Sequence, residues 1–240
     1  MRGISVVEKT RFPLFFFDDL WYTVFSKIAR GGEDVYQKFG KRALDLVFSL
    51  LFLLLLSPLL LLLTLTGVVA MGGKPFFGQL RPGRDERLFK MLKFRTMRET
   101  RDATGQLLPN AARLTAYGRF LRVTSLDELP QLFNILMGQM SFVGPRPLLP
   151  EFLPYYTAEE RRRHAVRPGL TGPAQIGGRN RLPWEARFAL DVAYADRVRL
   201  CTDLKILLLT LWHVLRRTGV VADPSTVEED FVAARKGAER

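Results

Sequence analysis

The pattern of hydrophobic and polar residues divides the chain into one long apolar stretch and a mixed remainder. The apolar stretch runs from Leu46 to Met71, is dominated by leucine and carries no charged side chain. At about 1.5 Å per residue, a helix of this length could cross the hydrocarbon core of a bilayer. The stretch begins too far from the N-terminus for a signal peptide and lacks a small-residue cleavage site. The pattern therefore predicts a membrane-embedded helical segment.

Ser57 and Pro58 interrupt the middle of this stretch. A proline at this position removes one backbone hydrogen bond and clashes with the carbonyl of Leu54, so the helix must kink or break. The Ser57 hydroxyl can satisfy a backbone group that the bend frees. Two helical arms joined at a break are therefore predicted.

Basic residues flank the apolar stretch on both sides. They are Lys38, Lys41 and Arg42 before it, and Lys74, Arg81, Arg84, Arg87, Lys90 and Lys93 after it. Positive residues favour the cytoplasmic side of a membrane. A re-entrant hairpin, which enters and leaves on the cytoplasmic face, satisfies both flanks, whereas a kinked single span places one flank outside. We favour the hairpin, with Lys41 and Arg42 at the membrane interface.

This division predicts three regions: an N-terminal extension (1–40), a re-entrant membrane hairpin (41–73) and a cytoplasmic domain (74–240). Residues 11–30, RFPLFFFDDLWYTVFSKIAR, are rich in aromatic side chains. They are typical of an interfacial amphipathic helix. A helix packed on the main domain fits the same pattern. The sequence leaves open whether the extension lies at the membrane interface or takes part in oligomerisation.

The remainder of the chain predicts a mixed, helix-rich α/β fold with short strands. Residues 76–78 and 88–94 have strand patterns, and residues 127–136 have a helical pattern. Residues 144–147, Gly-Pro-Arg-Pro, cannot form regular structure. Residues 200–215 form an apolar helix that packs on the core or lies on the membrane. We expect a compact cytoplasmic catalytic domain with interfacial amphipathic helices.

Composition adds a strong positive charge and few candidates for metal or disulfide chemistry. The net charge of +12 indicates an anionic partner, such as nucleic acid, acidic lipid headgroups or a phosphorylated substrate. The lone Cys201 excludes an internal disulfide. His164 and His213 lack the spacing of zinc ligands. Dinucleotide-binding, Walker A and nucleophile-elbow signatures are absent.

Fixed positive charge is dense between Arg81 and Arg122, and a solvated basic face is the simplest interpretation of it. Gly83 and Gly118 in this region would allow a ligand to approach the backbone closely. Arg146 is different because prolines on both sides restrain its backbone. A restrained arginine loses less entropy when it forms a bidentate phosphate contact. We therefore predict that Arg146 binds the substrate.

The segment SLDELPQL, residues 125–132, places two carboxylates side by side. Pro130 suits the first turn of a helix, which makes Asp127 a plausible N-cap and Glu128 a first-turn residue. Chemistry is the alternative, because an ionised Asp127 could act as a nucleophile while Glu128 binds Mg²⁺. The residues alone leave capping and chemistry both open.

Several motifs occur in one order: Lys41-Arg42-x-x-Asp45, Ser57-Pro58, Lys93-Phe94-Arg95-Thr96-Met97, Ser125-Leu126-Asp127-Glu128-Leu129-Pro130-Gln131, Met140-Ser141-Phe142-Val143-Gly144-Pro145-Arg146-Pro147, Arg167-Pro168-Gly169-Leu170-Thr171-Gly172 and Gly177-Gly178-Arg179-Asn180. Over residues 40–220 the chain resembles the bacterial sugar transferase family, the monotopic polyprenol-phosphate phosphoglycosyl transferases. The resemblance implies transfer of a sugar 1-phosphate from a UDP-sugar to polyprenol phosphate, with release of UMP. It also implies a re-entrant anchor in the bacterial inner membrane and a catalytic domain facing the cytoplasm.

The same resemblance implies the roles of individual residues. Asp127 would be the nucleophile that forms a phosphosugar-aspartyl intermediate, and Glu128 would bind Mg²⁺. The UDP-sugar site would comprise Arg146 and Pro147, with Lys93 and Arg122 nearby and, from a looser motif, Gln175 and Arg179.

Only about 40 residues precede Lys41, and residues 161–169 are similar to the minimal class of this family. That class implies an N-acetylated amino sugar, such as UDP-diacetylbacillosamine, as donor for the first membrane step of glycan assembly. A hexose-1-phosphate transferase for exopolysaccharide or O-antigen is the alternative within the family. A membrane-anchored, basic nucleic-acid-binding protein is the alternative from another class. We expect UDP-sugar, polyprenol phosphate and phospholipid as partners and no nucleic acid. The sequence does not decide whether the protein forms a homodimer.

Overall fold

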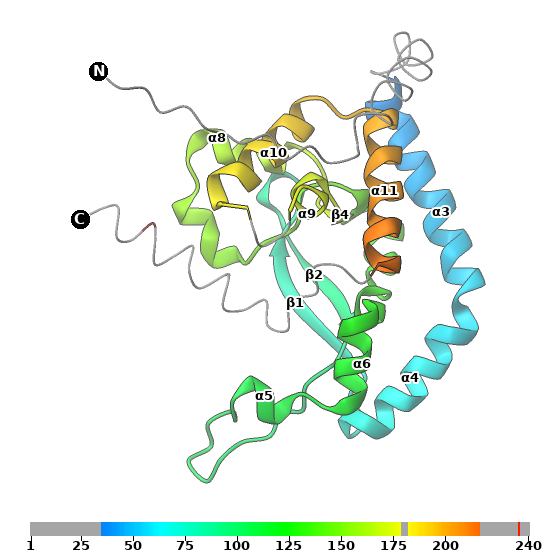
Figure 1. Cartoon of the computed structure of the whole chain (residues 1–240), viewed down its shortest axis with the longest axis vertical. Coiled ribbons are helices and arrows are strands. Elements are labelled where there is room, and N and C mark those ends of the chain that lie inside the picture. The colour runs from blue at the N-terminus through cyan, green and yellow to red at the C-terminus, as the bar shows by residue number, and fades with distance from the viewer. Residues whose placement is uncertain (1–34, 179–181, 217–234, 236–240) are drawn as a thin grey trace.

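A computed structural model describes residues 35–178, 182–216 and 235 of the chain. The expected helix at residues 11–30 and the predicted ligand Arg179 lie outside these residues. Two helices that follow one another in the chain form an arc along one side of the molecule, and the strands and the other helices lie inside it (Figure 1). The helix-rich α/β fold with short strands is confirmed.

The apolar stretch forms two helices joined at a bend. A short π-helical turn (η1, Tyr36–Gly40) leads into α3 (Lys41–Leu55), and α4 (Ser57–Met71) follows after a bend of 63°. The Ser57 hydroxyl donates a hydrogen bond of 2.8 Å to the carbonyl oxygen of Leu54, as the sequence predicted. Within the described part of the chain, neither helix alone has the length and hydropathy to cross a membrane, but the bent pair together does.

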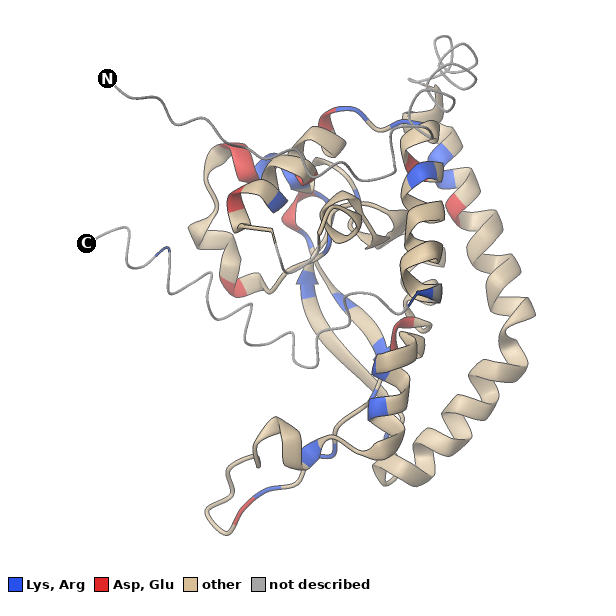
Figure 2. Ribbon diagram, in the orientation of Figure 1, with Lys and Arg blue, Asp and Glu red and all other residues tan. Residues whose placement is uncertain are grey.

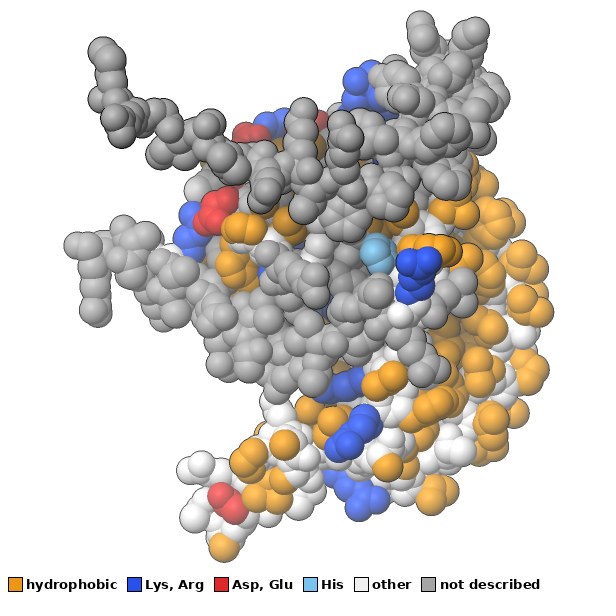
Figure 3. Space-filling model, in the orientation of Figure 1, with side chains coloured by type: hydrophobic (Ala, Val, Ile, Leu, Met, Phe, Trp, Pro, Cys, Tyr) orange, Lys and Arg blue, Asp and Glu red, His pale blue; other side chains and the backbone are white. Residues whose placement is uncertain are grey.

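Each arm of this helix pair has one face toward the protein and an apolar face turned outward. The buried positions are Asp45 and Ser49 on α3, and Leu63, Gly67 and Met71 on α4. These residues recur every four positions, which gives one stripe along each helix. Most of the remaining leucine, valine and phenylalanine side chains are exposed, and they cover the outer edge of the molecule (Figure 3).

The strands form two small sheets. In the first, β1 (Phe76–Pro82) pairs with β2 (Leu88–Phe94) in an antiparallel hairpin, which confirms both predicted strands and extends the first. In the second, β3 (Ser141–Val143) lies parallel to β4 (Gly169–Thr171). A side chain at Gly144 would overlap the backbone of the β4 segment, so this close pairing requires glycine.

The helices of the domain surround these sheets. Their bounds are α5 (Asn110–Arg113), α6 (Ala116–Thr124), α7 (Gln131–Leu136), α8 (Ala158–Arg161), α9 (Pro173–Ile176), α10 (Trp184–Asp196) and α11 (Leu200–Leu215), with 3-10 turns η2 (Arg84–Glu86), η3 (Leu126–Glu128), η4 (Pro150–Tyr155) and η5 (Arg162–Ala165). The α11 helix, predicted from sequence at the same bounds, packs Ile206 into the core beside Val143 and Tyr194. Its opposite face exposes Leu208, Leu211 and Trp212.

The first helix of the arc is joined to the domain by the side chains predicted at the membrane interface. Lys41 Nζ forms an ion pair with Asp203 of α11 at 2.5 Å. The Arg42 guanidinium donates to the carbonyl oxygens of Ile135 and Leu136 at 2.6 and 2.9 Å. Both carbonyls are at the C-terminal end of α7, where a positive charge complements the helix dipole. The two charges therefore bind protein partners, and their position at a membrane interface stays a prediction.

Asp45 completes this joint from inside the structure. One oxygen of its buried carboxylate accepts hydrogen bonds from the Ser141 hydroxyl at 3.1 Å and from the backbone N–H of Phe142 at 3.0 Å. A buried carboxylate needs such donors to offset its lost hydration. The Lys-Arg-x-x-Asp motif thus fixes α3 to strand β3 and to helices α7 and α11.

Candidate active site

The paired carboxylates lie in a 3-10 turn and not at the start of an α-helix. Asp127 and Glu128 belong to η3, and the next α-helix begins only at Gln131. The predicted helix over 127–136 is confirmed only from Gln131 to Leu136, and the predicted N-cap at Asp127 is wrong. The turn before Gln131 closes through bonds to the third residue back, from the Glu128 N–H to the Ser125 carbonyl oxygen at 3.3 Å and from the Leu129 N–H to the Leu126 carbonyl oxygen at 3.2 Å, which is 3-10 geometry. Capping does not account for Asp127 in this structure.

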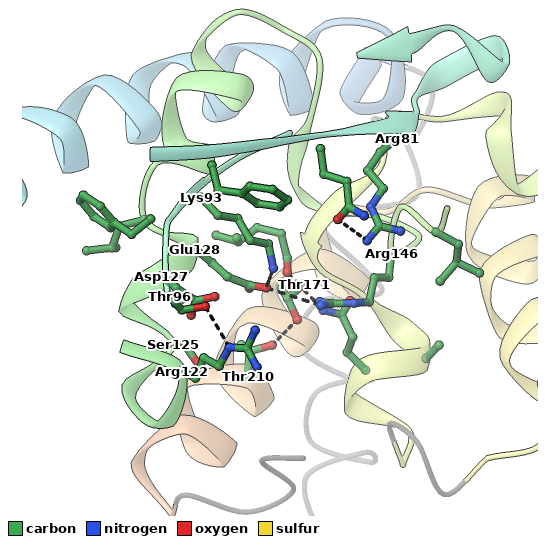
Figure 4. Close-up of a pocket in the computed structure, with 18 of the residues that line it drawn as sticks. Arg81, Lys93, Thr96, Arg122, Ser125, Asp127, Glu128, Arg146, Thr171 and Thr210 are labelled. Atoms are coloured by element: carbon green, nitrogen blue, oxygen red, sulfur yellow. Dashed lines mark hydrogen bonds and ion pairs between the residues drawn. The ribbon is translucent and has the colours of Figure 1, made fainter. Parts of the chain in front are cut away.

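Glu128 is held by two cations from distant parts of the chain. Its Oε1 lies 2.8 Å from Lys93 Nζ and 3.4 Å from an Arg146 guanidinium nitrogen. The close-up in Figure 4 shows these groups converging from β2, η3 and the segment after β3. Burial opposes ionisation of Glu128, but Lys93 and Arg146 outweigh it and lower its pKa to about 2. Glu128 is therefore ionised throughout the physiological pH range.

Asp127 has the opposite shift. Burial and the negative charge of Glu128 raise the pKa of Asp127 to about 6, while Lys93 and Arg122 partly oppose that rise. Arg122 is fixed beside it, since its Nε donates to the Thr96 hydroxyl at 3.1 Å. At neutral pH Asp127 is mostly ionised and only partly compensated by its neighbours. A carboxylate in this state is a stronger nucleophile than a fully paired one.

Both carboxylates line a cavity of about 700 Å³. This volume lies within the range of small-molecule and cofactor sites. The predicted substrate-binding residues Lys93, Arg122, Arg146 and Gln175 line the same cavity. Pro147 lines a much smaller adjoining cavity, of about 20 Å³, which also contacts Glu128. The structure thus brings together every predicted catalytic and substrate-binding residue that it describes, with Pro147 in the adjoining cavity.

Several cationic side chains line this cavity, among them Arg81, Lys93, Arg95, Arg122 and Arg146. Figure 2 shows Lys and Arg on the β1–β2 strands and on the neighbouring helices, whereas α4 has none. Cationic side chains with restricted freedom are suited to bind phosphate groups of a substrate.

A model of one protein family, described as bacterial sugar transferase, matches residues 36–217. The chain belongs to the bacterial sugar transferase family. The family predicted from the motifs is confirmed, and with it the prediction of a transferase enzyme.

Curated relatives agree with this assignment. The sugar transferase EpsL of Bacillus subtilis is 47% identical over 195 residues, which cover 81% of this chain and 96% of EpsL. The UDP-glucose:undecaprenyl-phosphate glucose-1-phosphate transferase of Klebsiella pneumoniae is 41% identical over 72% of this chain and 39% of its own length. The undecaprenyl-phosphate galactose phosphotransferase of Salmonella typhimurium is 39% identical over 76% of this chain and 42% of its own length. The chain therefore spans less than half of the latter two relatives.

In this sugar transferase, sequence reasoning missed part of the cavity wall. Phe77, Gln79 and Arg81 of β1 all line the cavity, and Arg81 donates to Gln79 at 2.9 Å. Alternate residues of a strand face the same side. The recurrence of polar side chains at 79 and 81 was therefore a usable signal. Arg163 and Asp191 also line the cavity, and neither was predicted.

Two glycines have a different role from the one predicted. A side chain at Gly118 would overlap the backbone of Thr96, and one at Gly83 would crowd the backbone oxygen of Arg87. Gly118 thus allows α6 to pack against the segment after β2, and Gly83 allows the β1–β2 turn to close. The prediction that these glycines admit a ligand to the backbone is wrong, because protein atoms already fill that space.

The carboxylate pair is a sparse donor set for a metal ion. Among the described residues, no three His, Cys, Asp or Glu side chains form a group that could hold a metal. A cation bound beside Glu128 would therefore need oxygen atoms from the substrate to complete its coordination.

Proposed function

We propose that this chain transfers a sugar 1-phosphate from a UDP-sugar to polyprenol phosphate and releases UMP. The observation that carries the proposal is Asp127, an incompletely paired carboxylate, beside three cations in a cavity large enough for a nucleotide sugar. The relatives named for UDP-glucose and for undecaprenyl phosphate support the donor and acceptor classes.

The cavity residues suggest a two-step reaction. In the first step, an Asp127 oxygen attacks the phosphorus that carries the sugar, and the bond from this phosphorus to the bridging oxygen breaks. UMP leaves with that oxygen and the electron pair, which leaves a phosphosugar-aspartyl intermediate. In the second step, a phosphate oxygen of the polyprenol attacks the same phosphorus. The product is a polyprenol diphosphate sugar, and the Asp127 carboxylate is restored.

The surrounding cations would stabilise the charge on the phosphoryl oxygens during both steps. Lys93 and Arg146 contact Glu128, while Arg122 is fixed by Thr96 on the side of Asp127. Cationic groups that are already oriented need little rearrangement as charge develops. The contribution of these residues is therefore electrostatic positioning of the donor.

The donor set also fits Mg²⁺, provided that the substrate phosphates supply the other ligands. Glu128 would be the protein ligand, because the hydrogen bonds from Lys93 and Arg146 both fall on Oε1 and leave Oε2 for the cation. When bound, the cation would neutralise phosphate charge and favour departure of UMP.

We also propose a monotopic placement on the bacterial inner membrane, with the domain in the cytoplasm. The bent helix pair buries one stripe against the domain and leaves the remaining apolar face for lipid. The exposed apolar face of α11 would lie at the headgroup level, and the net charge of +12 would favour acidic phospholipid.

The identity of the sugar has two candidates. The motif of residues 161–169 predicts an N-acetylated amino sugar such as diacetylated bacillosamine. The names of two relatives specify glucose and galactose, and this observation favours a UDP-hexose as the second candidate.

A panel of UDP-sugars tests the proposal. The panel should include UDP-hexoses and N-acetylated UDP-amino sugars. Detergent-solubilised protein with Mg²⁺ and undecaprenyl phosphate should release UMP from one or a few of them. Asp127→Asn in the same assay should release none. Absence of UMP with the whole panel, together with a salt-sensitive gel shift on generic DNA, would favour the nucleic-acid-binding alternative.

A further inference from the structure

Three consecutive arginines, Arg161 to Arg163, have separate environments in the structure. Arg162 lies at the surface and pairs with Glu159 and Asp196. Arg163 is only 2% exposed, and so is its partner Asp191 of α10. The Arg163 guanidinium contacts Asp191 Oδ2 through two nitrogens, at 2.6 and 3.1 Å. Arg163 is therefore a fully buried cation whose charge is balanced inside the protein.

The same guanidinium reaches the active-site segment. Arg163 Nη2 donates a 2.7 Å hydrogen bond to the backbone carbonyl oxygen of Arg146, the residue whose side chain contacts Glu128. On the preceding residue, the carbonyl oxygen of Pro145 accepts from the backbone N–H of Gly169 at 3.0 Å. The backbone of the Gly-Pro-Arg-Pro segment is thus held at two successive carbonyl groups.

Burial of this pair is not explained by stability alone. Both guanidinium contacts fall on Oδ2, and Asp191 Oδ1 is buried with no hydrogen-bond partner among the described residues. A buried ion pair with an unsatisfied oxygen is often no more stable than two well-packed apolar side chains. The carbonyl oxygen of Arg146, however, needs a donor that an apolar pair cannot supply.

We propose that Arg163, fixed by Asp191, is a positioning residue that sets the backbone at Arg146 and so aims the Arg146 guanidinium at Glu128 and at the donor phosphates. The assignment of Arg146 to the donor rests on the proposed function. Arg163 lines the cavity, but its guanidinium donates to Asp191 and to the Arg146 carbonyl oxygen. Its effect on the reaction passes through Arg146.

Paired substitutions separate this role from a structural one. Arg163→Met alone leaves Asp191 as an unpaired buried charge and should lower the melting temperature strongly. The double variant Arg163→Met/Asp191→Leu removes both charges and should recover most of that loss. Its KM for UDP-sugar should nevertheless stay at least tenfold above that of the wild type. A double variant with wild-type KM and kcat would overturn the proposal.

A double-mutant cycle tests whether Arg163 acts through Arg146. Arg146→Lys should raise KM in the wild-type background and add less than twofold in the Arg163→Met/Asp191→Leu background, since coupled residues are not additive. Full additivity of the two effects would show that Arg163 acts by another route. Arg162→Met, which breaks only surface pairs, is the matched control and should leave both constants unchanged.

Hydrogen exchange gives a result that does not depend on activity. In the charge-free double variant, the peptide that contains residues 141–148 should exchange faster than in the wild type, while the peptides of α3 and α11 should be unchanged. Unchanged exchange at 141–148 would overturn the positioning role whatever the substrate. Absence of UMP release by the wild type would instead refute the proposed function. The exchange measurement would still decide whether Arg163 positions the backbone at Arg146.

Discussion

The ammonium group of Lys93 lies 2.8 Å from Oε1 of Glu128, which joins strand β2 to the turn that carries both carboxylates. Arg146 contacts the same oxygen at 3.4 Å. The two carboxylates therefore differ in pKa. The two cations contact Glu128 and lower its pKa, whereas the negative charge of Asp127 is less completely balanced and its pKa is raised.

Lys93→Met should lower kcat/KM for UDP-sugar by about 10²-fold, a loss typical of removing one group that stabilises a transition state. The same change should raise the pKa of Glu128, since its nearest cation is lost. Steady-state UMP release measures the first effect. Lys90→Met is the control, because Lys90 lies on the same strand, is exposed and is absent from the cavity wall. Equal losses in both variants would contradict a specific role for Lys93.

Asp127→Asn should abolish the covalent intermediate and lower kcat by at least about 10³-fold, because the amide lacks the anionic nucleophile. Intact-protein mass spectrometry of the wild type with UDP-sugar alone should show an added sugar phosphate and a burst of UMP. The Asn variant should show neither while it still binds UDP-sugar. Turnover without a trappable adduct in the wild type, or normal turnover in the variant, would remove Asp127 from its assigned role.

The raised pKa of Asp127 predicts a pH-dependent cost in stability. Between its usual pKa of 3.8 and about 6 the native state holds more protons than the unfolded state, so the free energy of unfolding from this group falls as pH rises through 6. In metal-free buffer at pH 7, Asp127→Asn should therefore increase the free energy of unfolding by about 1–3 kcal/mol. The increase should shrink as pH falls toward 4. Chemical denaturation of both proteins between pH 4 and pH 7 measures this increase. An increase that does not depend on pH would contradict the prediction.

The bent helix pair predicts that both of its ends lie on the cytoplasmic side. Lys38→Cys and Lys74→Cys place single reporters before α3 and after α4, in a Cys201→Ser background. Both positions are exposed, so labelling is limited by the membrane and not by protein packing. An impermeant thiol reagent outside intact cells should label neither, and should label both after lysis. Labelling of one position from outside would show that the pair crosses the membrane.

Local sequence determined several features of this protein directly. The break at Ser57-Pro58, the β1–β2 strands and the α11 helix follow from interactions between residues a few positions apart. A proline removes a hydrogen bond wherever the chain goes afterwards, and an apolar helix keeps its period in any fold. The motifs were equally local, and they were sufficient to predict the family.

Local sequence patterns did not predict the structure around the paired carboxylates. Residues 125–132 have the pattern of a capped helix, but Ser125 has a left-handed conformation and a 3-10 turn precedes the α-helix that begins at Gln131. This arrangement sets the two carboxylates ahead of α7 and toward the cavity. Propensity counts each residue alone and takes no account of tertiary contacts, so it does not predict where the α-helix begins.

Only the tertiary structure decided which charges meet. Glu128 contacts Lys93 and Arg146, which are 35 and 18 residues away in the sequence, and Lys41 contacts Asp203, which is 162 residues away. In the Arg161–Arg163 run the sequence shows three equal cations, and only the fold buries Arg163 against Asp191 and directs it to Arg146. Coulomb energy and desolvation depend on distance in space and on burial, and the path of the whole chain sets both.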